Sequence, residues 1–397
     1  MMKRVAMLLN GPIQNDYRVI KIIETLSQKH SVHLFYINGN PSDDHQLFNE
    51  SVTLSSYTHQ ASNWVKFIRH SWFCYEFSFF EKRVKESGQH FDFIWANDLP
   101  TLNPAYNLSK MLKCKLIYDS HEIYTETINQ FFPRHSTGLK KFIFQSMISF
   151  MRKHGTSVEH RIFPQIDVFL TVNESLLNYF KERNDVRKGF VIMNLPKVDQ
   201  SITLNRIDFR EKYGWSPSTF VIIYQGQLNE GRGLFMLLES MKLLPMEFKL
   251  VVVGNGSLGK ELNDWTIRNS LTERIKFIDT VPLNELSAYT SGADLGINLL
   301  ETFNLSKEYA SPNKLFEYIH AAIPVVASDT IENQRVFSSF PIGKLTKNQP
   351  DVIAAAIIHV TNEKRSSFID ALAQAKSHYN WEKQEELLLS VLNSMLH

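Results

Sequence analysis

The chain has 397 residues, of which 43% are hydrophobic and 21% charged, a composition that is ordinary for proteins with buried cores and argues against disorder. Its formal net charge of +2 excludes a general nucleic-acid binder, because such proteins carry a strong excess of basic residues. The two cysteines, Cys74 and Cys114, argue against a disulfide framework and favour a reducing cytoplasm.

The first apolar run, Val5–Leu9, follows Lys3 and Arg4, which is the charge order of a secretion signal. The run is shorter than the usual apolar stretch of about 7–15 residues and no small-residue cleavage site follows, so we interpret it as a buried strand. No run of about 18 apolar residues occurs in the sequence, so no transmembrane helix is predicted.

Short apolar runs alternating with helical patterns predict two successive α/β domains. The first series of strands is expected at Val5–Leu9, Val32–Ile37, Phe93–Ala96, Leu116–Tyr118 and Val168–Val172, with helices such as Val19–Gln28 and Leu102–Leu112 between them. After a polar stretch around Lys197–Asn205, the second series is expected at Phe220–Tyr224, Lys249–Val253, Ile275–Phe277, Leu295–Leu299 and Pro324–Ala327. This order predicts two doubly wound, Rossmann-like domains, residues 1–200 and 201–378, that face a cleft.

Three loops of the first domain follow predicted strands, where ligands of doubly wound sheets bind. The loop Asn10–Arg18 contains Gly11 and Asp16; Asp16 is a candidate ligand-facing carboxylate or, equally, an N-cap for the following helix. His121 follows Leu116–Tyr118 and can donate a hydrogen bond to a sugar hydroxyl or a phosphate, or serve a structural role. The loop Asn97–Pro100 follows the predicted strand Phe93–Ala96 and is a weaker candidate for a ligand-binding loop.

The loop after Phe220–Tyr224 contains glycines on both sides of a cation. Gly226, Arg232 and Gly233 suit a loop that wraps a diphosphate, because a guanidinium makes bidentate contacts to phosphate oxygens. A glycine turn with a solvated arginine is the structural alternative. Gln227 lies in the same loop and can donate a hydrogen bond without adding charge.

The loop after the predicted strand Lys249–Val253 contains the pattern G-x-G-x-x-G, whose first two glycines are Gly254 and Gly256. Asp279 follows about 20 residues after this pattern, as a dinucleotide site requires. The motif follows the second strand of its domain rather than the first, which argues against a nicotinamide cofactor. The alternative is a glycine turn near a nucleotide, where missing side chains allow the backbone to approach the ligand.

The segment Tyr309–Ser328 reads as loop, helix and strand. Ser311 and Pro312 are expected to start a helix over Asn313–Ala322, and Pro324 to end it. The helix would begin with unpaired N–H groups at Asn313, Lys314 and Leu315 and the ammonium of Lys314, an end that suits a phosphate, while Glu317 could accept hydrogen bonds from a ribose. An ordinary capped helix that packs its apolar face into a core is the alternative.

This segment resembles the donor-site segment of retaining GT-B glycosyltransferases of family 4, in particular a bacterial branch. The matching positions are Pro312, Asn313, Lys314, Leu315, Phe316, Glu317, Tyr318, Ala321, Pro324 and Val325. The sequence Tyr118–Glu122 resembles the same branch, and Asp16 and Arg18 match an Asp-x-Arg of the family's first loop, which faces the acceptor and the donor phosphates. Two departures are Tyr309, where many members have a glutamate that touches the transferred sugar, and Gln227, where the family has the first of two cations.

The resemblance implies a GT-B fold in which a C-terminal helix, residues 379–397, returns to the first domain, and an enzyme that moves a sugar from a nucleoside-diphosphate sugar to a glycan or lipid-linked acceptor. Retention and a role in bacterial cell-surface polysaccharide synthesis are implied as well. The expected catalytic residues are His121, Asp16, Arg232 and Lys314. The expected nucleotide-binding residues are Gly11, Gly226, Arg232, Gly254, Gly256, Thr280 in the base-holding loop Ile278–Val281, Asn313, Lys314, Leu315 and Glu317.

No Asp-x-Asp and no zinc-type His/Cys spacing occurs in the sequence, so the reaction is expected to need neither a metal nor a cofactor. An epimerase of the same fold, or a non-catalytic partner subunit suggested by Tyr309 and Gln227, remain alternatives. The sequence leaves the base, sugar, acceptor, linkage and oligomeric state open.

Two segments of the first domain, Trp64–Phe80 and Leu139–Lys153, combine aromatic and basic side chains. Such segments can lie in a membrane interface, which would place the enzyme at the inner face of the membrane, or they can be core helices or a subunit interface.

Overall fold

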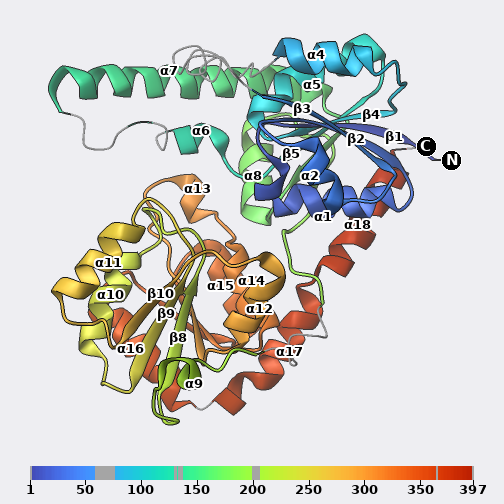
Figure 1. Cartoon of the computed structure of the whole chain (residues 1–397). Coiled ribbons are helices and arrows are strands. Elements are labelled where there is room, and N and C mark those ends of the chain that lie inside the picture. The colour runs from blue at the N-terminus through green and yellow to red at the C-terminus, as the bar shows by residue number, and fades with distance from the viewer. Residues whose placement is uncertain are drawn as a thin grey trace. The chain divides into compact units, whose positions relative to one another are not determined.

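The computed structural model describes residues 2–58, 77–128, 132, 137–198, 206–363 and 365–395 (Figure 1). The chain divides into two compact units: unit 1 comprises Met1–Met193 and Gln384–His397, and unit 2 comprises Asn194–Lys383. Residues 64–76 of the predicted aromatic-basic segment Trp64–Phe80, and residues 199–205 of the polar stretch, lie outside the described part.

Unit 1 contains a parallel sheet in the order β3-β2-β1-β4-β5-β6-β7, so the direction of winding reverses between β1 and β4. Its strands are β1 (Arg4–Leu9), β2 (Ser31–Ile37), β3 (Val52–Tyr57), β4 (Phe93–Asn97), β5 (Lys115–Ser120), β6 (Val168–Thr171) and β7 (Gly189–Val191). Its helices are α1 (Tyr17–Ser27), α2 (Pro41–Asp44), α4 (Phe77–Glu86), α5 (Leu99–Leu112), α6 (Tyr124–Thr127), α7 (Gly138–Ile162) and α8 (Glu174–Arg183), with 3₁₀ turns η1 (Ile13–Asn15), η2 (His45–Leu47) and η4 (Phe163–Gln165).

Unit 2 repeats this winding with the order β10-β9-β8-β11-β12-β13, so its reversal lies between β8 and β11. Its strands are β8 (Phe220–Gln225), β9 (Phe248–Val253), β10 (Ile275–Ile278), β11 (Leu295–Asn298), β12 (Val325–Ser328) and β13 (Gly343–Thr346). Its helices are α9 (Phe209–Tyr213), α10 (Leu234–Leu243), α11 (Gly259–Arg268), α12 (Leu283–Ser291), α13 (Leu305–Glu308), α14 (Asn313–His320), α15 (Ile331–Ser339), α16 (Pro350–Asn362) and α17 (Ile369–His378), with the 3₁₀ turn η5 (Arg365–Phe368). In Figure 1, α10, α11 and α16 lie on one face of the sheet and α12, α14 and α15 on the other.

The central strands form where the sequence has continuous apolar runs, because helices cover both faces of a parallel sheet. In unit 1 the core beneath α5 and α7 is rich in aromatic rings: those of Phe163, Phe169 and Phe180 have centroids 5.0 to 5.7 Å apart. Such offset and edge-to-face pairs add to the burial of apolar area. The core therefore holds the strand ends, and the loops that follow them, in fixed positions.

The last helix, α18 (Trp381–Ser394), is shared between the units. At its start the N–H of Trp381 donates to the carbonyl of Pro196 at 2.9 Å, within unit 2. From Gln384 on, the helix belongs to unit 1, where the Gln384 side chain accepts from the N–H of Met193 at 2.8 Å.

The prediction of two doubly wound, Rossmann-like sheets is confirmed, with strand ends shifted by one or two residues. Three strands were not predicted: β3, β7 and β13, which all lie at sheet edges, and β7 has only three residues. Edge strands are covered on fewer sides, so their sequences lack the long apolar runs that reveal the central strands. Among the residues that the structure describes, no helix is long and apolar enough to cross a membrane.

Candidate active site

Most sequence-predicted residues lie at the carboxyl ends of strands beside the point where each sheet reverses. In unit 2 these residues lie in the loop after β8 and at the start of α14, which follows β11, whereas Gly254 and Gly256 follow β9 and Thr280 follows β10, farther from the reversal. In unit 1 they are the loops after β1, β4 and β5. Doubly wound sheets bind ligands at such positions.

Lys314 carries a buried ammonium group at the start of α14. Its side chain is 7% exposed, and its Nζ lies 3.7 Å from the centroid of the Tyr224 ring. Among the described residues none accepts a hydrogen bond from this ammonium. Burial, followed by the charge of Arg232, lowers the pKa of Lys314 well below its ordinary value, although Glu317 opposes the shift. Since a buried charge without a partner is costly, this geometry favours an anionic ligand at Lys314.

Arg232 lies in the loop after β8, on a turn held by the next loop along the sheet. The N–H of Glu301 donates to the carbonyl of Gly231 at 3.0 Å, and a carboxylate oxygen of Glu301 accepts from the N–H of Gly233 at 3.1 Å. Both glycines have positive φ, and Arg232 between them is half-buried. Sequence reasoning missed Glu301, because nothing in its neighbourhood links it to a loop some 70 residues earlier.

Glu317 lies in α14, four residues after Asn313, and is half-buried. Its Oε2 accepts a hydrogen bond of 2.5 Å from Nε2 of Gln225, the last residue of β8. A carboxylate at this position is therefore held at the strand end beside Gly226, and Gln225 is a second residue that the sequence analysis did not single out.

The start of α14 differs from the expectation. Pro312 rather than Ser311 is the N-cap, and the N–H of Leu315 donates to the carbonyl of Pro312 at 3.1 Å. The N–H of Leu315 is thus used inside the first turn, which leaves Asn313 and Lys314 as the candidate backbone donors. The helix ends at His320, short of the predicted Ala322, because Ala322 adopts a left-handed conformation with φ of 54°.

Gly254 and Gly256 lie in the loop after β9 and are explained by packing between loops. A Cβ on Gly254 would lie 2.1 Å from the carbonyl oxygen of Gly226, and one on Gly256 would lie 2.6 Å from the backbone of Leu228. The glycines let two backbones approach each other, and their predicted position beside a nucleotide stays a prediction. In the loop after β10, the N–H of Thr280 donates to the Asp279 carboxylate at 2.6 Å.

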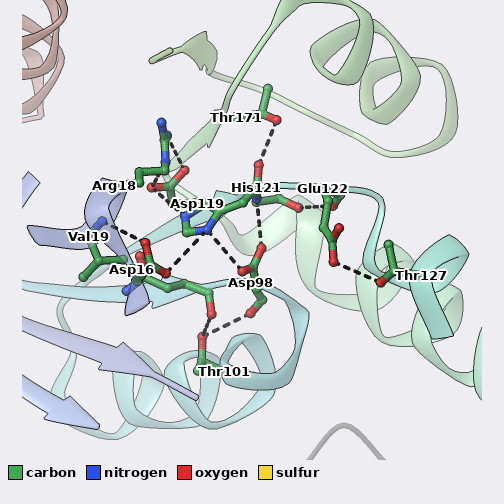
Figure 2. A network of polar contacts seen from close by, with 12 residues as sticks. Asp16, Arg18, Val19, Asp98, Thr101, Asp119, His121, Glu122, Thr127 and Thr171 are labelled. Atoms are coloured by element: carbon green, nitrogen blue, oxygen red, sulfur yellow. Dashed lines mark hydrogen bonds and ion pairs between the residues drawn. The ribbon is translucent and has the colours of Figure 1, made fainter. Parts of the chain in front are cut away.

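His121 is the centre of an acidic cluster in unit 1 (Figure 2). Its Nδ1 lies 3.2 Å from Asp98 and 3.9 Å from Asp16, and its Nε2 lies 3.5 Å from Asp119. Burial alone would lower the pKa of His121, but Asp98, Asp119 and Asp16 together raise it to about 9. The imidazole is therefore a charged hydrogen-bond donor at neutral pH and not a base.

Arg18 does not face a ligand, which corrects the expectation from its Asp-x-Arg match. Its guanidinium is 3% exposed and makes a bidentate contact to Asp119, with Nε and Nη2 at 3.1 and 2.6 Å from the two carboxylate oxygens, and its Nη1 donates to the carbonyl of Ile192. Burial would raise the pKa of Asp119, but the charges of Arg18 and His121 lower it well below its ordinary value. The pair is a buried structural contact beneath His121.

Asp16 serves the capping role that the sequence left open. Its Oδ1 accepts from the N–H of Val19 at 3.1 Å, so it is the N-cap of α1, while its Oδ2 faces His121. Gly11 lies in the same loop, and a Cβ built on it would meet no atom within 4 Å.

Asp98 takes a larger part in the cluster than its weak sequence signal indicated. Its backbone lies at φ 59° and ψ 166°, a region that is essentially restricted to glycine. Its Oδ1 accepts from the backbone N–H of His121 at 2.9 Å, and burial is the main cause that raises its pKa to about 6. Strain of this kind is concentrated at functional sites. The only sequence signal was its position directly after β4.

Comparisons with known proteins concern the family and the fold. Residues 205–376 match the protein family described as "Glycosyl transferases group 1". No curated protein sequence matches the chain. The fold is similar to HepE from Anabaena in complex with UDP and glucose (TM-score 0.70, 16% identity, 99% of this chain and 100% of that chain). It is also similar to sucrose-phosphate synthase from Thermosynechococcus elongatus (0.71, 15%, 99% and 99%) and to WaaG, a glycosyltransferase involved in lipopolysaccharide biosynthesis (0.68, 13%, 98% and 99%).

The chain thus has the GT-B fold, and residues 205–376 form a glycosyltransferase group 1 domain. The enzyme class that this fold and domain define is a glycosyltransferase. Within the described residues, no group of three or more His, Cys, Asp or Glu side chains is arranged to hold a metal ion.

Proposed function

We propose that this glycosyltransferase moves a sugar from a nucleoside-diphosphate sugar to a glycan or lipid-linked acceptor in cell-surface polysaccharide synthesis, with retention and without a metal ion. The observation that carries the proposal is the buried ammonium of Lys314 at the start of α14, which has no hydrogen-bond partner in the part of the chain that the structure describes. Structures similar in fold contain UDP or UDP-glucose, which supports a nucleotide sugar as the donor.

In this proposal the negative charge of the donor diphosphate neutralises the positive charges of Lys314 and Arg232. Phosphate oxygens accept from Lys314, from Arg232 and from the N–H of Asn313, and the Glu317 carboxylate accepts from the ribose. Negative charge develops on the diphosphate as the bond to the sugar breaks, and fixed cations stabilise it without rearranging. Lys314 and Arg232 are close enough for their charges to interact, so the site is preorganised for a dianion.

We assign the acceptor to unit 1, where the positive charge of the His121 imidazolium attracts the oxygens of its hydroxyls or phosphates. The Asp16, Asp98 and Asp119 carboxylates that surround His121 are occupied with cations or backbone N–H groups. This supports a reaction in which the proton of the acceptor passes to the leaving phosphate rather than to a side-chain base.

The donor assignment is tested by titrating UDP, ADP, GDP and CDP, and their glucose conjugates, against the protein in excess chelator. Arg232→Ala is expected to weaken binding by about 1.5–3 kcal/mol, or about 10- to 150-fold, since it removes a charge-assisted contact. The control is Arg268→Ala, which removes an exposed arginine on α11 whose Nε donates to the carbonyl of Asp264.

Unchanged affinity in Arg232→Ala removes the diphosphate-clamp assignment. Turnover that stops in chelator and returns with Mg²⁺ or Mn²⁺ contradicts the metal-free mechanism. Donor turnover without an acceptor indicates the epimerase alternative, and nucleotide binding absent from the unmodified protein indicates a non-catalytic subunit.

We further propose that α7 contacts a membrane. Met151 and Phe144 pack against the core of unit 1, but a second apolar face is exposed. This exposed face is formed by Leu139 (75% exposed), Phe142 (68%), Ile143 (45%) and Phe150 (49%), whose spacing places them on one side of the helix. Lys140 and Lys141 are exposed beside it, as is typical of helices that bind anionic membrane surfaces.

Replacing Phe142 and Ile143 together with serine is expected to weaken binding to vesicles that contain phosphatidylglycerol by about tenfold or more, because two apolar side chains no longer enter the interface. Vesicle co-sedimentation measures this, and nucleotide affinity is expected to stay unchanged. The control is Ile267→Ser, at a 56% exposed position in unit 2. Arg152, a basic residue further along α7, is left unchanged in this test because its guanidinium donates to the carbonyl of Thr125 and to the carboxylate of Glu126. An unmodified protein that does not bind vesicles refutes the membrane proposal.

A further inference from the structure

Gln225 is a buried amide at the end of the central strand β8, immediately before the loop that carries Arg232. Its side chain is 1% exposed. Its Nε2 donates to Oε2 of Glu317 at 2.5 Å, and its Oε1 accepts from the hydroxyl of Thr290 in α12 at 2.7 Å. Both ends of the amide are therefore engaged, one with α14 and one with α12.

The direction of the amide follows from the chemistry of its partners. An ionised carboxylate can only accept hydrogen bonds, so the NH₂ group of Gln225 must face Glu317. The oxygen then faces Thr290, whose hydroxyl supplies the donor. Thr290 is itself 1% exposed and lies 2.8 Å from the carbonyl of Leu286, so its position is fixed within α12.

The backbone of Gln225 also contacts α14. Its N–H donates to the hydroxyl of Tyr318 at 3.3 Å, and that hydroxyl donates to the carbonyl of Ile297 at 3.1 Å. The Tyr318 ring packs where Gly296 has no side chain, since a Cβ there would lie 2.4 Å from the ring. The end of β8 thus sets both the place of α14 and the direction of the Glu317 carboxylate.

We propose that Gln225 is a positioning residue, which orients the Glu317 carboxylate so that it can accept hydrogen bonds from the ribose hydroxyls of the donor. This inference rests on the proposed function. An acidic side chain on a helix has several rotatable bonds, and a carboxylate held in one rotamer before the ligand arrives loses less freedom on binding. Thr290 completes the arrangement by holding the amide. Such outer contacts commonly orient ligand-binding side chains.

The test compares the nucleoside diphosphate that binds the unmodified protein best, from UDP, ADP, GDP and CDP, with its 2′,3′-dideoxy form. The variants are Gln225→Leu, Thr290→Val and Glu317→Ala, with Gln334→Leu as a control at an exposed glutamine on α15. The unmodified protein is expected to favour the ribonucleotide by about tenfold or more. Gln225→Leu is expected to reduce the ratio of the two affinities toward one, while the affinity for the dideoxy form stays unchanged.

Thr290→Val is expected to reduce the preference in the same direction but less, and it keeps the test valid if Gln225→Leu does not fold. The double variant Gln225→Leu with Glu317→Ala is expected to lose no more preference than Glu317→Ala alone, because Gln225 acts only through Glu317.

Equal loss of affinity for both nucleotides in Gln225→Leu, or an unchanged preference, overturns the positioning role. A preference that Glu317→Ala does not alter overturns it as well, since Glu317 then does not bind the ribose. An unmodified protein that binds none of the four nucleotides overturns the proposed function itself, which separates the two failures.

Discussion

Replacing Lys314 with methionine is expected to abolish nucleotide binding and, at the same time, to make the protein more stable. The ammonium is buried, lies over the Tyr224 ring and has no hydrogen-bond partner among the described residues, so it destabilises the ligand-free fold. Methionine has a similar length and no charge. We expect affinity for the nucleoside diphosphate to fall about 100-fold or more and the melting temperature to rise, because the residue is retained for binding rather than for stability.

The charge state of Lys314 adds a second measurement of the same prediction. Its pKa is lowered in the ligand-free protein, chiefly by burial, and an adjacent dianion raises it again. Nucleotide binding is therefore expected to take up protons and to weaken as the pH rises above the lowered pKa. Calorimetry in two buffers of different ionisation enthalpy measures the uptake, which Lys314→Met should remove.

In the ligand-free protein the same group is expected to make stability rise with pH toward the ordinary lysine value of 10.5, because the unfolded chain binds this proton more tightly than the folded one. Lys314→Met should flatten that rise. A variant that binds the nucleotide normally, or that is less stable than the unmodified protein, contradicts the assignment of Lys314 to an anion.

Replacing Arg18 with methionine is expected to destabilise unit 1 by about 3–5 kcal/mol, which is a large part of the stability of a typical domain. The change leaves the fully buried Asp119 carboxylate without its bidentate partner. Denaturant unfolding followed by near-ultraviolet circular dichroism measures the loss. Arg152→Met is the matched control, because Arg152 pairs with Glu126 where both side chains are partly exposed, and we expect it to cost about 1 kcal/mol or less.

Loss of less than about 1 kcal/mol in Arg18→Met would contradict the structural role of the pair. The double variant Arg18→Met with Asp119→Leu is expected to recover part of the stability, since it removes the second buried charge as well.

The sequence predicted the fold well because central strands of parallel sheets depend on local patterns. Runs such as Val5–Leu9 and Leu250–Val253 are apolar throughout and are flanked by helical periodicity, so their order along the chain reveals the winding of the sheets. The start of α14 was also a local signal, in that Pro312 marks a helix start and Lys314 places a cation in the first turn. Edge strands such as β13 have no comparable pattern, and they escaped prediction.

By itself, then, the sequence determined the two α/β halves and the loops at their strand ends, and it pointed to Arg232 and Lys314, the cations that we propose bind a diphosphate. Only the tertiary structure decided that Arg18 is buried against Asp119, which lies 101 residues away, and that Asp98 and His121 share one acidic cluster. It also decided that Gln225 holds Glu317 across 92 residues and that Gly254 accommodates the backbone of Gly226. The physical reason is that burial, ion pairing and pKa depend on neighbours in space, which come from strands distant in sequence and brought together when the sheet forms.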